Sequence, residues 1–238
     1  MLELENRAVQ RGIYINSDFL TLAEQTELHN MKLMPPPTLF GGFDNAERKV
    51  ALFGDEGEMG YPPQFHVTTI KISPLNQKFA DELSHRDFLG ALMNLGIKRE
   101  LLGDILVIDN IAYLFCLENI ASYIVEQLKR VKHTSVLAEI CKALPEAALP
   151  QPIEMNFTAA SERLDLIISE VFNLSRSDSK EMVTSELVAI NSIITTNPSH
   201  QLPPDSVVSV RGKGRFIYYG SNGMSKKGKF KMSVGIYK

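Results

Sequence analysis

The chain has few cysteines and no long apolar stretch. Its 238 residues include two cysteines, Cys116 and Cys141, which are far apart and form no Cys-x-x-Cys pair. This spacing argues against a disulfide framework and a thiolate zinc site, and favours a reducing cytoplasm. No apolar run approaches the ~20 residues that span a bilayer. Residues 1–11 are polar and lack the apolar core of a signal peptide, so we expect no membrane association.

Motifs of the common enzyme classes are also absent. There is no nucleophile elbow and no glycine-rich dinucleotide loop, so we expect no enzyme activity, no cofactor and no small-molecule substrate. His85-Arg86-Asp87 has a catalytic composition, but it lies in the expected first turn of a helix. There Asp87 is better explained as part of a helix cap. No two of the five histidines have metal-ligand spacing; they are His29, His66, His85, His133 and His200.

Charge is distributed unevenly along the chain. Residues 1–154 contain 14 basic and 21 acidic residues, whereas residues 155–238 contain 11 basic and 7 acidic ones. Residues 206–238 contain eight basic residues and no acidic one. A basic end on an acidic body indicates a polyanionic partner. A solvated basic surface without a partner is the alternative.

Residues 1–62 predict an N-terminal helical segment. A helix is expected over 18–31, capped by Ser17 or Asp18, because apolar residues recur at helical spacing. Pro35, Pro36 and Pro37 end it, since proline donates no backbone hydrogen bond. Residues 47–53 fit a short helix or a strand, and residues 55–63 fit a loop.

Residues 63–150 predict a central α+β domain of the ferredoxin-like type, which RNA-recognition motifs share. The elements follow the order β-α-β-β-α-β. Ser84 and Asp87 form a capping box, and Asp109-Asn110 forms a two-residue hairpin turn. Tyr113 and Phe115 project from one face of a central strand, where they either stack on bases or pack in a core; core packing is favoured. The expected elements are 65–72, 84–95, 105–108, 111–117, 119–131 and 134–140.

Pro145, Pro150 and Pro152 mark a boundary within 144–152, and a third domain follows over 157–238. Two helices begin it, one capped by Ser161 and one by a capping box of Ser175 and Asp178. In the last strand Phe230, Met232, Val234 and Ile236 share one face, while Lys229 and Lys231 share the other. The expected strands are 187–190, 206–211, 215–219 and 229–237.

Three basic segments of this domain can meet a polyanion. Arg176 begins the second helix, where the macrodipole disfavours a cation and a bound phosphate is favoured. The alternative is an ion pair with Asp178 or Glu181. Arg211-Gly212-Lys213-Gly214-Arg215 and 225–231 combine cations with glycines that allow close backbone approach. The alternative for both is a turn with solvated charges.

The C-terminal residues resemble the ribosomal-protein S-four type of RNA-binding domain, two helices plus a small antiparallel sheet. The resemblance rests on Arg163-Leu164-Asp165, Leu174-Ser175-Arg176-Ser177, Val188-Ala189-Ile190-Asn191 and Val208-Ser209-Val210-Arg211-Gly212. One departure is Glu186, where the family usually has the glycine that ends the second helix. Together with the basic segments, the resemblance implies these RNA-binding residues: Arg163, Ser175, Arg176, Lys180, Asn191, Arg211, Lys213, Arg215, Lys226, Lys227, Lys229 and Lys231.

Other segments are similar to the YlmH family of bacterial RNA-binding proteins. They are Phe40-Gly41-Gly42-Phe43, Ala46-Glu47-Arg48-Lys49, residues 84–92, Gly96-Ile97-Lys98-Arg99 and Gly103-Asp104-Ile105. The resemblance implies a cytoplasmic, non-enzymatic factor associated with the large ribosomal subunit and transfer RNA in handling obstructed translation complexes, and with cell division.

Two other functions remain open at this point. Pseudouridine synthases contain the same type of module, and their catalytic aspartate follows an Arg-Leu motif. Here Arg163-Leu164-Asp165 lies inside the module, and the chain has no room for the larger catalytic domain. The second alternative is a protein-interaction scaffold whose basic end promotes solubility.

Overall fold

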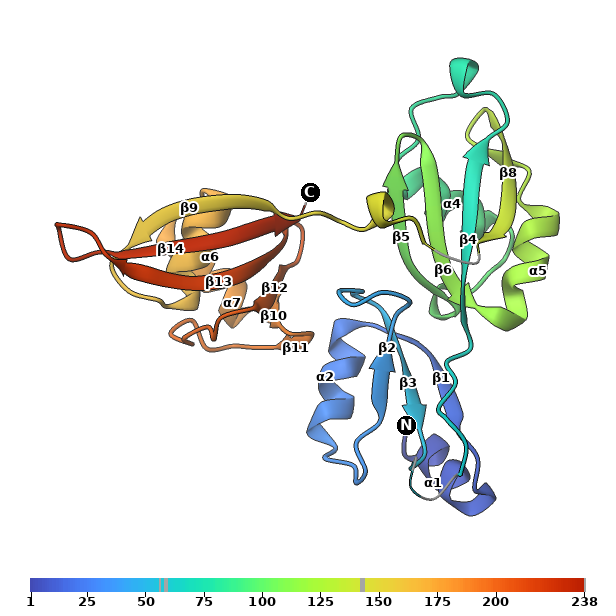
Figure 1. Cartoon of the computed structure of the whole chain (residues 1–238), viewed down its shortest axis with the longest axis horizontal. Helices are drawn as coiled ribbons and strands as arrows, with labels where there is room; N and C mark the ends of the chain where they lie inside the picture. The colour runs from blue at the N-terminus through green and yellow to red at the C-terminus, as the bar shows by residue number, and fades with distance from the viewer. Residues whose placement is uncertain (56, 58–59, 142–143, 238) are drawn as a thin grey trace. The chain divides into compact units, whose positions relative to one another are not determined.

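A computed structural model describes residues 1–55, 57, 60–141 and 144–237. The protein has a mixed α+β fold with two compact units, Met1–Leu149 and Pro150–Lys238 (Figure 1). Each unit has its own apolar core.

The first 55 residues contain a small sheet as well as helices. Helix α1 (Leu2–Arg11) precedes strand β1 (Ile15–Leu20), and α2 (Leu22–Asn30) follows. Strands β2 (Thr38–Phe40) and β3 (Lys49–Phe53) complete an antiparallel sheet of order β1-β3-β2. The predicted helical segment therefore also contains a sheet, and the residues left open as helix or strand, 47–53, include β3.

The helix predicted from Asp18 begins later than expected. Residues 18–20 belong to β1, because Phe19 and Leu20 pair with β3 and are buried. Thr21 is the actual N-cap: its hydroxyl accepts the Glu24 N–H, and the Glu24 carboxylate accepts the Thr21 N–H. The predicted loop 55–63 lies partly outside the described residues.

The central residues have the predicted β-α-β-β-α-β order, and their five strands have the order β5-β6-β4-β8-β7. The added strand β7 (Arg130–Val131) pairs with β8, so α5 ends at Gln127 and not at the predicted Val131. Both helices pack on one face of the sheet around a core that includes Ile70, Phe88 and Leu114. The other elements are β4 (Val67–Pro74), α4 (His85–Asn94), β5 (Leu102–Ile108), β6 (Ile111–Leu117), α5 (Glu118–Gln127) and β8 (Thr134–Cys141).

Two predicted local features of this sheet and its helix are confirmed. Ser84 and Asp87 form the reciprocal capping box at the start of α4. Asp109 and Asn110 both have positive φ, 49° and 64°, and they join β5 to β6. A two-residue turn with both φ values positive matches the twist of its strands, and Asn and Asp tolerate it.

Phe115 and Tyr113 pack in the interior. Phe115 is fully buried, and its ring centroid lies 5.1 Å from that of Phe43 in the N-terminal segment. Gly42 has φ 101° and lies against the same ring, where a Cβ atom would collide with it. Tyr113 is 8% exposed. The core-packing interpretation is therefore correct, and the N-terminal segment occupies the place of a stacked base.

The C-terminal unit is a six-stranded antiparallel sheet of order β11-β10-β12-β13-β14-β9, with both helices on one face. Its core includes Leu164, Ile168, Phe216 and Val234. The edge strand β9 was not predicted, because its partner β14 lies far along the chain. The elements are β9 (Ile153–Ala159), α6 (Leu164–Phe172), α7 (Arg176–Thr184), β10 (Val188–Ile190), β11 (Ile193–Ile194), β12 (Ser206–Val210), β13 (Gly214–Met224) and β14 (Phe230–Tyr237).

The two faces of β14 differ as predicted. Met232 and Val234 are buried against the helices, with Phe230 and Ile236 at the margin of that core. Lys231 points to the opposite face and is exposed. The predicted cap at Ser161 is wrong: α6 begins after Arg163 with no side-chain cap. The carbonyls of His200 and Pro198 accept the N–H groups of Leu164 and Asp165 in its place.

Candidate nucleic-acid interface

A buried carboxylate orients an arginine at the start of α6. Asp165 accepts hydrogen bonds from the Arg163 Nε at 2.9 Å and the Arg163 Nη2 at 2.8 Å. Its Oδ1 also accepts the Leu166 N–H at 3.0 Å. The Asp165 side chain is 1% exposed, whereas that of Arg163 is 33% exposed. The bidentate pair therefore fixes a guanidinium at the surface, and its hydrogen bonds to Asp165 raise the pKa of Arg163.

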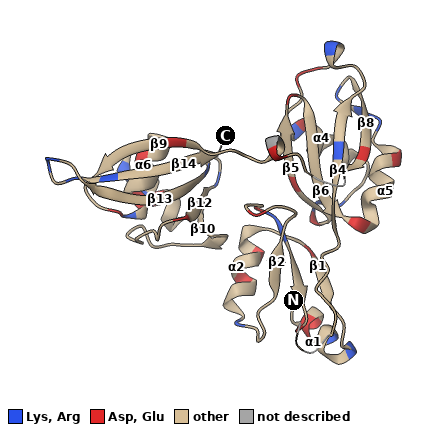
Figure 2. Ribbon diagram, in the orientation of Figure 1, with Lys and Arg blue, Asp and Glu red and all other residues tan. Residues whose placement is uncertain are grey.

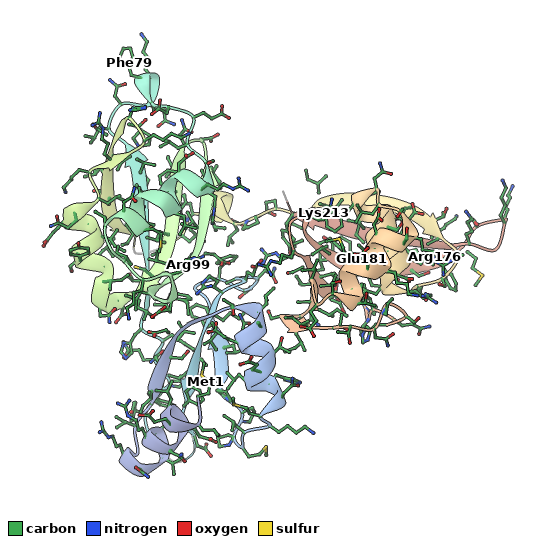
Figure 3. The ribbon with its side chains drawn as sticks, turned by 180° about the vertical axis from the view of Figure 1, so that it is seen from behind. Met1, Phe79, Arg99, Arg176, Glu181 and Lys213 are labelled. Atoms are coloured by element: carbon green, nitrogen blue, oxygen red, sulfur yellow. The ribbon has the colours of Figure 1, made fainter. Side chains whose placement is uncertain are left out.

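Arg176 approaches the same carboxylate from α7. Its Nε lies 4.0 Å from the Asp165 Oδ2, and its side chain is 65% exposed. The partners that the sequence suggested, Asp178 and Glu181, lie further along α7 (Figure 3 labels Arg176 and Glu181). One carboxylate thus faces two guanidiniums, while Asp178 supplies a further negative charge in the first turn of α7.

The start of α7 holds two more candidates. The Ser175 hydroxyl accepts the Asp178 N–H at 3.1 Å and lies 2.8 Å from the Ser177 hydroxyl. The structure shows only this half of the predicted capping box. Lys180 is exposed further along the helix. Ser175 therefore has a structural role, and Arg176 and Lys180 present the cations.

Asn191 closes a turn between β10 and β11. It has φ 49°, its backbone N–H donates to the Val207 carbonyl, and its Oδ1 accepts the Val207 N–H, both at 2.8 Å. These bonds hold the turn against β12. The structure thus gives this residue a structural role, and a contact between Asn191 and RNA remains a proposal.

The Arg211–Arg215 segment forms the hairpin between β12 and β13. Gly212 and Gly214 have φ of 77° and 133°, which only glycine adopts without strain. Arg211 and Lys213 are exposed, whereas Arg215 is half-buried with its guanidinium carbon 5.2 Å from the ring centroid of Tyr237. Two of these three cations therefore point freely into solvent.

The other lysines lie at the hairpin between β13 and β14. The Ser225 N–H donates to the Lys229 carbonyl at 2.7 Å, and the Gly228 N–H donates to the Ser225 carbonyl at 2.9 Å. This tight turn presents Lys226, Lys227 and Lys229, all exposed.

The twelve candidates do not form one patch. Arg215 pairs with Tyr237 at one end of β14, whereas Phe230 pairs with Ala159 at the other. Seven residues of strand separate these ends by roughly 24 Å. Arg163 and Arg176 lie at the same end as the lysine hairpin. Ala159 pairs with Phe230 beside that hairpin, α6 begins shortly after Ala159, and Arg176 is close to Asp165 in its first turn. Figure 3 labels Lys213 at one end of the unit, and Figure 2 shows the turn between β13 and β14, with its basic residues in blue, at the other.

Sequence reasoning missed a second pair of arginines in the N-terminal unit. Arg48 donates to the carbonyls of Phe19 and Leu102, and Arg99 donates to those of Leu102 and Gly103. Burial, followed by repulsion from Arg48, lowers the pKa of Arg99 to about 10. These hydrogen bonds all end on backbone carbonyls, so the pair joins the N-terminal segment to the central sheet. Both residues lie in segments that resemble the YlmH family, but nothing in their spacing predicts the contact.

Within the part of the chain that the structure describes, no group of three or more His, Cys, Asp or Glu side chains could hold a metal ion. None of the described helices has the length and apolar character needed to cross a membrane.

Comparisons with known proteins give a family match for the central residues. Residues 62–143 match the family model described as "Putative RNA-binding domain in YlmH". Over 198 residues the chain is 29% identical to the ribosome-associated protein quality control protein P2 of Bacillus subtilis, covering 81% of this chain and 75% of that protein. A solved structure, the cell division protein ylmH from Streptococcus pneumoniae, is 22% identical and has a TM-score of 0.47. The matched region covers 59% of this chain and 86% of the Streptococcus pneumoniae chain.

Proposed function

We propose that this chain is a non-enzymatic RNA-binding factor that acts on the ribosome, and that it belongs to the YlmH family. The similarity to a ribosome-associated quality control protein over most of the chain supports the ribosome as its partner. The finer proposal is that it binds ribosomal RNA and transfer RNA on the large subunit, in the rescue or quality control of obstructed translation complexes. A cytoplasmic location follows from that role.

One observation favours the C-terminal unit as the main RNA contact. Asp165 fixes Arg163 and approaches Arg176 at the start of two helices, on the side of the unit that holds the lysine hairpin. Arginine guanidinium groups match the geometry of phosphate oxygens. We propose that this unit is an S-four type module over 157–238, next to a ferredoxin-like domain over 63–150 and a segment over 1–62.

The central domain is a second candidate, because its family model describes it as RNA-binding. Phe115, the residue best placed to stack on a base, is covered by the N-terminal segment. RNA would therefore contact other residues there, such as the exposed Arg86 and Lys98.

An RNA-modifying activity has less support. A catalytic aspartate must reach its substrate, whereas Asp165 is 1% exposed and its two oxygens are engaged by Arg163, Leu166 and Arg176. A role as a protein-interaction scaffold for cell division would not explain why two guanidiniums lie close together at the helix starts.

Crosslinking in cells followed by sequencing of the bound RNA tests this proposal. We expect ribosomal RNA and transfer RNA to dominate the reads. With purified ribosomes, about four to six phosphate contacts should give a slope of log affinity against log salt of roughly −3 to −5. A slope near zero together with reads from unrelated RNA would refute the proposal.

A further inference from the structure

Among the described residues of the C-terminal unit, one face of the sheet, here called the outer face, has no helix packed on it. Both helices of this unit pack on the opposite face, behind the sheet in the view of Figure 1. Because side chains alternate along a strand, the residues of β13 and β14 that do not enter the core point outward. Along β14 these are Lys231, Ser233, Gly235 and Tyr237, and on β13 they include Arg215, Ile217 and Tyr219.

Two tyrosines lie on this face at the end where the chain terminates. The pairing of β13 with β14 shifts between Tyr218 and Gly220, so Tyr219 is the extra residue of a bulge. Tyr218 is fully buried, whereas Tyr219 is 39% exposed. Bulges redirect a side chain, and here the Tyr219 hydroxyl lies over Gly235. A Cβ atom at Gly235 would collide with that hydroxyl, so the glycine lets the ring lie across the sheet.

Cations accompany the tyrosines along the same strand. The Arg215 guanidinium lies over the ring of Tyr237 at 5.2 Å from its centroid. Lys231 is exposed on the outward side, and the lysine hairpin continues beyond it. The neighbouring strand β9 adds one acidic residue to this face, Glu154, which pairs with Gly235. The face thus has a cation near each end of β14, Arg215 beside Tyr237 and Lys231 near the lysine hairpin, roughly 20 Å apart along the strand. Between them lie the aromatic ring of Tyr219 and the buried Ser233 and Gly235.

We propose that this outer face binds single-stranded RNA, with a base stacked on Tyr219 and the phosphates following β14 towards Lys231. Aromatic rings bind any base through its π-face, and Lys231 with the lysine hairpin beyond it supplies cations for the phosphates of a flexible strand. The inference deepens the proposed function by adding a single-stranded contact on the face opposite the helices. A structured RNA held at Arg163 and Arg176 would leave this face open for an unpaired segment.

Intrinsic fluorescence provides a direct test, since the chain has seven tyrosines and no tryptophan. The probes are a 12-nucleotide oligouridine and a stable RNA hairpin, titrated into the full chain at low salt. In wild type we expect oligouridine to quench tyrosine emission. Tyr219→Leu should weaken oligouridine binding by about tenfold, the effect of losing one stacked base, and leave hairpin affinity unchanged. Tyr219→Phe keeps the ring and should bind as wild type does.

Tyr123→Leu is the matched control, because Tyr123 is 47% exposed on α5 of the other unit. It should alter neither affinity, and thermal melts should show all variants folded. Wild-type oligouridine affinity in Tyr219→Leu, or an equal loss for both probes, would overturn the inference. So would hairpin binding without oligouridine binding, although that result leaves the proposed function intact. Binding of neither probe would overturn both.

Discussion

Arg176 and Asp165 lie 4.0 Å apart, Nε to Oδ2, although they belong to different helices. Asp165 is already bound by both donors of the Arg163 fork, so Arg176 is a second cation at a carboxylate that one cation neutralises. The arrangement leaves the Arg176 side chain 65% exposed and available to a phosphate.

Replacing Arg176 should separate binding from folding. A largely exposed ion pair contributes about 0–1 kcal/mol, and the macrodipole disfavours a cation at this position, so Arg176→Ala should leave the melting temperature nearly unchanged. Losing a charge-assisted phosphate contact should weaken RNA binding by about 1–3 kcal/mol. Thermal melts and an RNA titration measure both effects. Lys129→Ala, in the exposed region after α5, is the control and should change neither. Reduced stability with unchanged RNA affinity would show that Arg176 is structural.

Asp165→Asn should lower the stability of the C-terminal unit. The substitution removes the charge that holds Arg163, and it leaves the buried site with an amide in place of an acceptor of three hydrogen bonds. A loss of 1 kcal/mol lowers the melting temperature of a domain of this size by about 4–8 °C, and we expect at least that shift. Glu170→Gln, on the exposed side of α6, is the matched control. Equal melting temperatures for the two variants would contradict the structural role of the carboxylate.

Glu186→Gly should stabilise the C-terminal unit. Glu186 has φ 59° and closes a Schellman motif, in which the Leu187 N–H donates to the Met182 carbonyl and the Glu186 N–H donates to the Val183 carbonyl. A left-handed non-glycine residue costs about 1–2 kcal/mol, part of which the greater chain entropy of glycine offsets. We therefore expect a gain of roughly 0.5–1 kcal/mol, seen as a higher denaturation midpoint in urea. A loss of stability would mean that the Glu186 side chain makes a compensating contact.

Asp87 should make the free energy of unfolding of the central domain depend on pH in the acidic range. Hydrogen bonds from the hydroxyl and N–H of Ser84 and from Lys132 lower the pKa of Asp87 to about 2. The folded state therefore favours the carboxylate, and this contribution is complete above the unfolded pKa of about 3.9 and lost as the pH falls through 2. Urea midpoints of wild type and Asp87→Asn should differ at pH 7 and converge towards pH 2. A difference that stays constant with pH would refute this assignment.

Local chemistry predicted several elements because it needs only neighbouring residues. Ser84 with Asp87, and Asp109 with Asn110, determine a helix start and a turn wherever the chain places them. Residues 18–20 were predicted as helix because Leu20 fits helical spacing, but pairing with β3 decides their conformation.

Contacts between distant residues could not be predicted from spacing. β9 is a strand because β14 pairs with it, and Asp165 meets Arg176 only because α6 packs on α7. The cations themselves were identified from the sequence, but their separation into two ends of the unit depends on the strand register. Similarly, the ring of Phe43 over Phe115 could not be inferred before the N-terminal segment was placed.

The central claim is that the C-terminal unit supplies most of the affinity for structured RNA. Titration of one RNA with residues 150–238 and, separately, with residues 1–149 tests it most directly, since each unit has its own core. We expect residues 150–238 to bind within about tenfold of the full chain and residues 1–149 to bind at least about a hundredfold more weakly, while remaining folded. Near full affinity in residues 1–149 would contradict the account and assign the RNA site to the central domain.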